Sequence, residues 1–183
     1  MARLLFGELV AGALANYAAA NLAAELTAIQ ADAGDGIKLA MPAAGNITPY
    51  ERLVITGGEA DAAAGYVAHL EVYEGDLLFL DPYTDQDAER AVYRAPATLR
   101  LTFFNNRGAT KAVCETQRRR YSVALFNLFN KAPDLGDPTT ALRRVVPTAV
   151  RYDRQEDQGG VIKARVMLEV LCGGDAGVEE VQP

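Results

Sequence analysis

Residues 145 to 172 read VVPTAVRYDRQEDQGGVIKARVMLEVLC, and this stretch decides the fold. A period of two is typical of a β-strand with one buried face. The incoming arm of a hairpin is expected at Thr148–Arg154. The polar segment Gln155–Gly160 follows as the turn, because its two glycines tolerate positive φ. The returning strand is expected to bury one apolar face, formed by Ile162, Ala164, Val166, Leu168, Val170 and Cys172.

The beginning of the chain is alanine-rich and apolar from residue 2 to about residue 31. Its apolar side chains recur at helical spacing, which predicts a long amphipathic helix. Glu8, Asn16 and Glu25 interrupt the apolar run, so no uninterrupted stretch of about 20 apolar residues remains. We therefore expect neither a signal peptide nor a membrane span here. Gly34 and Gly36 are expected to end the helix.

The middle of the chain alternates short strands with turns, and a second amphipathic helix is expected at residues 111–130. In the strand predicted at residues 97–104, Leu99, Leu101 and Phe103 should face the core. His69 falls on the more polar face of its strand, where a surface or interface position is expected. Further strands are predicted at residues 37–41, 52–56, 65–73 and 77–80.

The order of these elements predicts the α+β class. We expect a mixed or mostly antiparallel sheet with two main helices packed on it, closed by a C-terminal β-hairpin. Residues 1–172 should form a single domain, and residues 173–183 a C-terminal tail.

Composition limits the chemistry that the chain can perform. The 183 residues carry a formal net charge of −6, which argues against a protein that grips phosphate backbones. Cys114 and Cys172 have no CxxC partner and are expected to be buried, reduced thiols. His69 is the single histidine, which excludes a histidine-rich metal site. The sequence also lacks the GxGxxG, P-loop, HExxH and GxSxG motifs, so no catalytic residue, metal or cofactor is predicted.

Three consecutive arginines stand out on the second helix. Arg118, Arg119 and Arg120 spread over a wide arc of a helix, so only some of them can face one partner. The simplest interpretation is a solvated face with salt bridges to acidic neighbours. A subunit interface is the functional alternative, because arginine is favoured at interfaces.

An acidic segment lies at Asp81, Asp85, Asp87 and Glu89. It lacks the central glycine and the ligand spacing of an EF-hand loop, so a solvated acidic loop is the favoured interpretation. A small metal-dependent hydrolase or nuclease that uses Asp81, Asp85 and Asp87 is the alternative from another class.

From Ala97 to Cys172 the chain reads as an alternating strand, an amphipathic helix and the hairpin. This run resembles the C-terminal half of the tail terminator proteins of long-tailed bacteriophages, the minor tail proteins that cap the tail tube. The resemblance covers well under half of the chain at the level of individual residues. The matching positions are Arg151, Tyr152, Asp153, Arg154, Glu156, Asp157 and Gly159.

The resemblance implies a structural virion protein rather than an enzyme, made in the bacterial cytoplasm and built into the tail or neck. Members form a ring, usually of six subunits, that stops tube growth and presents a surface to the head. The implied partners are further copies of the chain, the tail-tube protein and a head–tail connector protein. DNA would pass through the lumen without sequence-specific binding, and no membrane is involved. A head–tail connector (neck adaptor) or a tail-tube protein is the alternative within the same class.

A ring needs two different faces that meet between neighbouring subunits. Under the resemblance, the candidates for the basic face are Arg118, Arg119 and Arg120. The candidates for the acidic face are Asp85, Asp87, Glu156 and Asp157.

Overall fold

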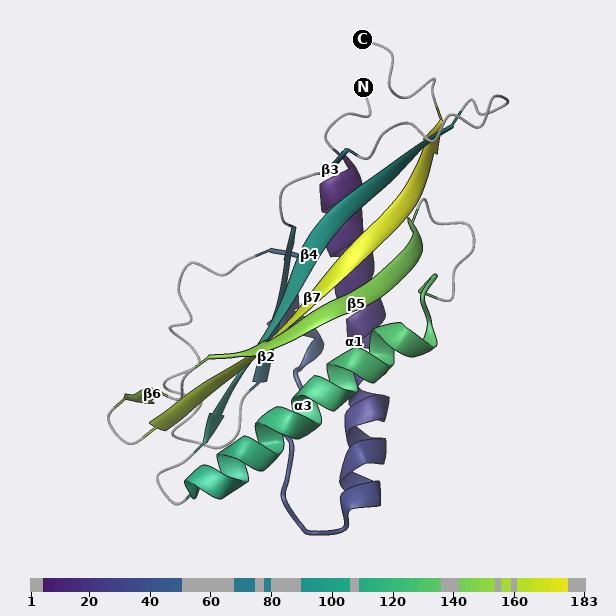
Figure 1. The fold of residues 1–183 in the computed structure, drawn as a ribbon. Helices are drawn as coiled ribbons and strands as arrows, with labels where there is room; N and C mark the ends of the chain where they lie inside the picture. The colour runs from purple at the N-terminus through teal and green to yellow at the C-terminus, as the bar shows by residue number, and fades with distance from the viewer. Residues whose placement is uncertain are drawn as a thin grey trace.

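The computed structural model describes residues 5–50, 68–74, 78–79, 90–105, 109–135, 142–153, 156–158 and 161–177. Two long helices accompany one sheet, so the predicted α+β class is confirmed (Figure 1). The helices are α1 (Leu5–Ala33) and α3 (Lys111–Lys131), and η1 (Ala44–Asn46) is a single 3-10 turn. The strands are β1 (Ile47–Thr48), β2 (Ala68–Glu74), β3 (Leu78–Phe79), β4 (Arg90–Asn105), β5 (Leu142–Tyr152), β6 (Glu156–Gln158) and β7 (Val161–Gly177).

The sheet is mixed, as predicted. Its main path runs in the order β1-β2-β4-β7-β5, with β3 paired to β4 and β6 paired to β7. The β1–β2 pair is parallel and the other pairs are antiparallel. The β4–β7 pairing is the longest, extending from Arg90↔Gly177 to Asn105↔Ile162. Within the described chain, β5 lies at the end of this path and pairs only with β7.

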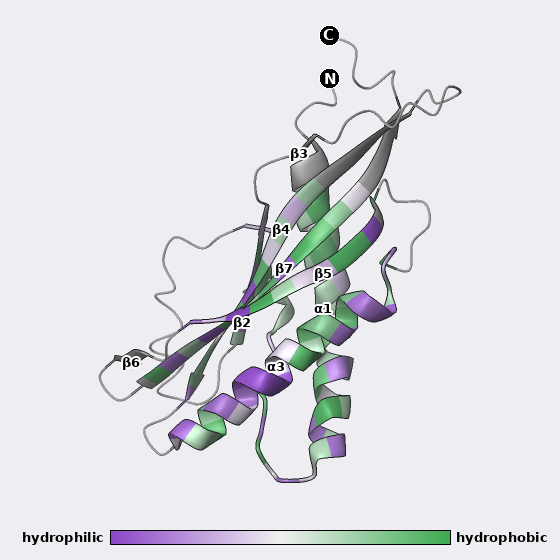
Figure 2. Ribbon diagram, viewed as in Figure 1, coloured by the Kyte–Doolittle hydropathy of each residue, from purple (hydrophilic) through white to green (hydrophobic). Residues whose placement is uncertain are grey.

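One face of the sheet forms a hydrophobic core with both helices. Alternate residues of β4 and β7 face each other there, as in the pairs Leu99↔Leu168 and Leu101↔Val166. All four side chains are buried, which confirms the alternation predicted for both strands. Helix α1 contributes Leu14, Leu22 and Leu26 to the same cluster, and α3 contributes Tyr121, Leu125 and Phe129. Figure 2 shows hydrophobic and hydrophilic residues mixed along α3, as expected of a helix with one buried and one polar side.

The end of α1 and the start of α3 carry the signals that the sequence indicates. After α1, Gly34 and Gly36 adopt φ of +60° and +75°, the left-handed conformation that glycine tolerates at a helix end. At the start of α3, the Thr110 side chain accepts a hydrogen bond from the backbone N–H of Val113. No helix in the described segments combines the length and the hydropathy that a membrane span requires.

The C-terminal hairpin is longer and tighter than predicted. Strand β5 begins at Leu142 rather than Thr148. The pair Gln158↔Val161 leaves only Gly159 and Gly160 between the strands, so Glu156–Gln158 forms β6 instead of a turn. Polar residues pair readily in a ladder because the bonds are made by the main chain.

The predicted start of the C-terminal tail at Gly173 is too early. Strand β7 continues to Gly177, and Gly173–Gly177 pair with Arg94–Arg90 of β4. Glycine weakens a strand but does not prevent ladder hydrogen bonds, which explains why composition alone indicated a tail. Residues 178–183 lie outside the described part.

Two further expectations need correction. Residues 37–41 form no strand. His69 is 4% exposed, so the expected surface position is wrong. It lies opposite Thr102 of β4, which is also buried, because β2 and β4 are inner strands of the sheet. The strand predicted at residues 52–56 falls outside the described residues.

Candidate functional site

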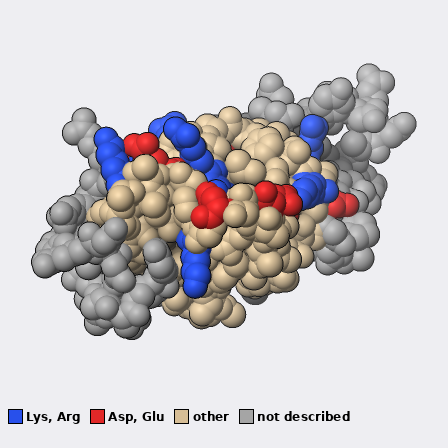
Figure 3. Space-filling model, turned by 90° about the horizontal axis from the view of Figure 1, so that it is seen from below, with Lys and Arg blue, Asp and Glu red and all other residues tan. Residues whose placement is uncertain are grey.

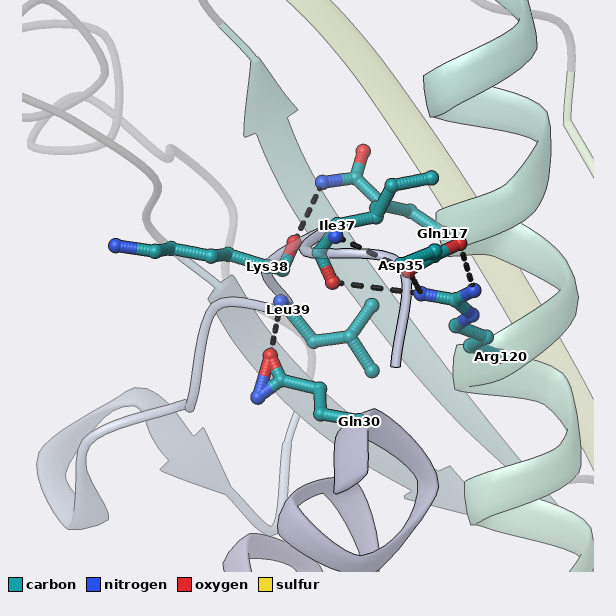
Figure 4. Close-up of polar contacts among 7 residues, drawn as sticks. All are labelled: Gln30, Asp35, Ile37, Lys38, Leu39, Gln117 and Arg120. Carbon is teal, nitrogen blue, oxygen red and sulfur yellow. Dashed lines mark hydrogen bonds and ion pairs between the residues drawn. The ribbon is translucent and has the colours of Figure 1, made fainter. Parts of the chain in front are cut away.

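The three consecutive arginines of α3 point in different directions. Arg120 turns towards the segment after α1, where its Nη1 donates to Asp35 Oδ1 at 2.9 Å and to the Ile37 carbonyl at 3.4 Å (Figure 4). Arg118 turns towards β5 and donates from Nη1 to the Asp153 carbonyl at 3.3 Å. Arg119 is exposed, and none of the described residues gives it a hydrogen bond or ion pair. The three arginines therefore do not form one basic patch. Arg119 is the one among them that is open to a partner.

Side chains hold the segment after α1 in place of a strand ladder (Figure 4). Gln117 Nε2 donates to the Lys38 carbonyl at 2.8 Å, and the Tyr121 hydroxyl donates to the Ala40 carbonyl at 2.9 Å. Between them, the Leu39 N–H donates to Gln30 Oε1 at 2.7 Å. These bonds pair the backbone N–H and C=O groups that a neighbouring strand was expected to pair. Helix α3 is thereby fixed to the segment that follows α1.

Arg120 also stabilises the charged form of Asp35. The hydrogen bond from the Arg120 guanidinium is the main reason why the pKa of the Asp35 carboxyl lies below its ordinary value. The same contact raises the pKa of Arg120. Arg120 is thus a structural residue of the monomer, which limits its availability to a neighbouring subunit.

A second polar contact ties α1 to α3. The Glu25 carboxylate accepts hydrogen bonds from Asn127 Nδ2 at 3.0 Å and from Lys131 Nζ at 2.8 Å. Desolvation opposes ionisation of Glu25, but the bonds from Lys131 and Asn127 outweigh it and lower its pKa. Near this contact, the rings of Tyr17 and Phe129 lie 5.8 Å apart between centroids.

Both cysteines are free and buried, as predicted. Asn105 Nδ2 lies 3.0 Å from Cys114 Sγ and donates to Gln117 Oε1 at 2.7 Å. Burial raises the pKa of Cys114, and it raises the pKa of Cys172 to about 12. Thiols that remain protonated in this way are poor nucleophiles and poor metal ligands.

Exposed apolar side chains occur on both α3 and β5, two elements that contact each other. They are Val123 (49% exposed), Phe126 (41%), Val150 (36%) and Tyr152 (49%), and we call them together the α3–β5 surface. The hydroxyl groups of Ser122 and Tyr152, 2.9 Å apart, join the two elements. The Arg118 guanidinium lies 5.5 Å from the centroid of the Tyr152 ring, a cation–π distance.

Sequence reasoning missed most of this surface. The resemblance singled out Tyr152, but Val123, Phe126 and Val150 were not identified. A signal was present: Arg119, Val123 and Phe126 recur at helical spacing beside the core-facing residues of α3. Exposed apolar residues beside an arginine, outside the core face, are a sign of a contact with another chain.

The face of the sheet away from the helices carries paired charges. Glu71 of β2 and Arg100 of β4 form an ion pair at 2.8 Å, with side-chain exposures of 0% and 18%. Arg100 also lies 5.4 Å from the centroid of the Tyr73 ring. Arg151 pairs with Glu169 across β5 and β7 at 2.9 Å. In the view of Figure 3, basic and acidic side chains are intermixed over the described part, without a single basic stripe.

The acidic candidates are placed only in part. Glu156 and Asp157 lie in β6, opposite Lys163 and Ile162 of β7. Asp85 and Asp87 lie outside the described residues, as does Asp81. Among the residues that are described, no three His, Cys, Asp or Glu side chains form a group that could hold a metal ion. The interface role of the basic and acidic candidates remains a prediction.

Compared with known proteins, the chain matches no protein-family model and has no significant match among curated proteins.

Proposed function

We propose that this chain is a structural subunit of a bacteriophage virion that assembles into a ring on the tail tube, as tail terminator proteins do. The residue pattern from Ala97 to Cys172 supports this proposal through its resemblance to that family. The observation that carries it is the α3–β5 surface. There, apolar side chains, an arginine without a partner among the described residues and the edge of the sheet occur together.

The chemistry of this surface suits a protein–protein contact. Interface centres are enriched in aromatic residues and arginine, and Tyr152, Phe126 and Arg119 supply both. The chain as a whole is acidic, with a formal net charge of −6. A basic and apolar patch on an acidic subunit favours contact with a different, acidic region of the next subunit. Such heterologous contacts close into rings when the rotation between subunits permits.

The proposed partners follow from a place at the end of the tail tube. One side of the ring would contact the tail-tube protein, and the other would face a head–tail connector protein. An acidic ring would let DNA pass without holding it, because it offers few groups that neutralise phosphates. In this role the protein is structural and catalyses no reaction.

A head–tail connector or a tail-tube protein would use a similar surface. The three stations differ in what the protein assembles with. A tube protein polymerises by itself into long tubes, a connector binds the portal side of the neck, and a terminator adds to the end of a finished tube.

The test is the mass of the purified protein in solution, measured by native mass spectrometry and light scattering, with electron microscopy of the particles. We expect a closed ring, or a monomer that becomes a ring on the ends of added tail tubes. Long tubes formed by the protein alone would instead assign it to the tube. A monomer that ignores tail tubes and binds Mg²⁺ or Ca²⁺ would overturn the proposal and direct attention to Asp81, Asp85 and Asp87.

A further inference from the structure

We infer that the edge of β5 at Val150–Tyr152 accepts an extended, acidic segment of a second copy of this chain as an additional strand. This inference rests on the proposed ring function and specifies the contact that would build the ring.

The direction of the backbone groups in β5 supports this inference. The Asp153 N–H donates to the Arg165 carbonyl of β7 at 3.4 Å, so the backbone groups of Asp153 point towards β7. In an antiparallel pair, hydrogen-bonded and non-hydrogen-bonded positions alternate. Arg151 lies two residues earlier and opposite Met167, so its backbone groups also point towards β7. The N–H and C=O groups of Val150 and Tyr152 consequently point away from β7, towards the open edge.

The first half of the same edge is closed. The Val145 N–H donates to the Pro133 carbonyl at 2.6 Å, which covers the edge at that point. Pro147 has no N–H to offer, and a register shift between Pro147 and Ala149 interrupts the ladder. Proline and irregularities of this kind are common means by which proteins protect an edge strand. Among the described residues, none of these devices is present at Val150–Tyr152, which leaves this part of the edge able to pair.

Side chains beside the open edge would add affinity and specificity. Tyr152 contacts Ser122 and Arg118 of α3, and Val150 of β5 and Val123 and Phe126 of α3 are also exposed. When a strand is added to a sheet, main-chain hydrogen bonds supply much of the affinity, and side-chain contacts select the partner. Here α3 forms a wall along which every second side chain of the incoming strand would lie.

Charge indicates an acidic partner segment and excludes pairing of two identical edges. On the helix side of β5, Arg118 lies over the Tyr152 ring and the exposed Arg119 follows it on α3, whereas Arg151 lies on the opposite face and pairs with Glu169. Two copies of this edge in antiparallel pairing would bring their arginines together, and like charges on neighbouring strands are destabilising. An acidic segment avoids this repulsion. The sequence carries such a stretch at residues 81–89, whereas Glu156 and Asp157 already pair with β7 as part of β6.

The experiment compares Val150→Pro with Val150→Thr. Proline removes the N–H that faces the open edge and leaves the ladder to β7 intact, whereas threonine keeps both the N–H and the β-branched shape. We expect Val150→Pro to raise the protein concentration needed for ring formation at least tenfold. Val150→Thr should change that concentration less than threefold. Circular dichroism of the monomers verifies that both variants are folded.

Amide hydrogen exchange of the wild-type protein provides a measurement that needs no variant. The amides of Val150 and Tyr152 should exchange at least a hundredfold more slowly in the ring than in the monomer. The Arg151 amide, which faces β7, should be protected in both. This protection should appear in rings that the purified chain forms alone. In rings on tail tubes, it should appear only where neighbouring copies touch.

The outcomes separate the two proposals. If the wild-type protein forms no ring with or without tail tubes, the proposed function fails and this inference falls with it. If rings form while Val150→Pro assembles normally and the Val150 and Tyr152 amides stay unprotected, the edge inference is wrong and the ring function stands. Protection of these amides by tail-tube protein before any ring forms would also overturn the second copy as the occupant.

Discussion

The hydroxyl groups of Ser122 and Tyr152 lie 2.9 Å apart and join α3 to the last residue of β5. Tyr152 thus has two roles, because its hydroxyl fastens β5 to α3 while its ring remains about half exposed. The two roles can be separated by substitution, since phenylalanine keeps the ring and alanine removes it.

Tyr152→Phe should lower the free energy of unfolding by about 1 kcal/mol, the typical net value of one hydrogen bond, and leave assembly intact. Tyr152→Ala should weaken ring formation tenfold or more, because a large aromatic side chain at an interface centre often dominates binding. Urea unfolding of the monomer and sedimentation of the assembly measure the two effects. Equal assembly of both variants would remove Tyr152 from the contact.

The arginines of α3 should differ in the same way. Arg119→Glu should leave the unfolding midpoint unchanged, because the described residues give its side chain no partner, and should impair ring formation. Arg120→Glu should destabilise the monomer, because it places a second carboxylate beside Asp35. Thermal unfolding and native mass spectrometry of both variants provide the comparison.

A charge exchange tests the partner face. In a heterologous ring every subunit carries both faces, so reversal of Asp85 and Asp87 to lysine in the Arg119→Glu chain should restore assembly. The matched control reverses Glu156 and Asp157 instead. Rescue by one pair alone identifies the acidic segment, and failure of both pairs contradicts an acidic partner for Arg119.

The buried pair Glu71–Arg100 should be essential to stability and irrelevant to assembly at the α3–β5 surface. Arg100→Met would leave the fully buried Glu71 carboxylate without this partner, and removal of one member of such a pair costs about 3–5 kcal/mol. The double substitution Glu71→Leu with Arg100→Met should recover a large part of that loss. Chemical denaturation of the two single variants and the double variant completes the cycle, and purely additive losses would contradict the coupling.

The sequence predicted those helices and strands that are determined by local patterns, such as alternation of apolar residues and capping residues at helix ends. The alternation from Ile162 to Cys172 places one face of β7 in the core, and Gly34, Gly36 and Thr110 mark helix ends. Contacts between distant segments escaped prediction. Residues 37–41 look like a strand, but Gln30, Gln117 and Tyr121 take the hydrogen bonds that a neighbouring strand would have made.

The candidate site was predictable only in outline for the same reason. Three consecutive arginines appear as one patch in a sequence. Asp35, from a segment 85 positions away, binds Arg120, and the Asp153 carbonyl binds Arg118. The open edge at Val150 depends on which strand lies beside β5, and sequence periodicity carries no information about strand order.

The two thiols should be inert in the folded protein. Burial raises the pKa of both, that of Cys172 to about 12, so Cys172 forms almost no thiolate at pH 8 and Cys114 forms less thiolate than an exposed cysteine. We expect no labelling by iodoacetamide at pH 8 over hours, and labelling of both residues once urea unfolds the chain. Mass spectrometry counts the adducts. Rapid labelling of the native protein would contradict the buried positions of Cys114 and Cys172.

Acid should loosen the attachment of α3 to α1 and to the segment that follows it. The pKa values of Asp35 and Glu25 are lowered in the folded state by Arg120 and by Lys131 with Asn127, respectively. A carboxyl group whose folded pKa lies below its unfolded pKa stabilises the fold above the unfolded value, near pH 4. That contribution disappears as the pH falls through the lower, folded value. The unfolding midpoint should therefore be flat from pH 7 to pH 5 and fall below about pH 4, less steeply in Asp35→Asn and Glu25→Gln than in the wild type. Identical slopes in all three proteins would show that these two carboxyl groups do not govern the acid transition.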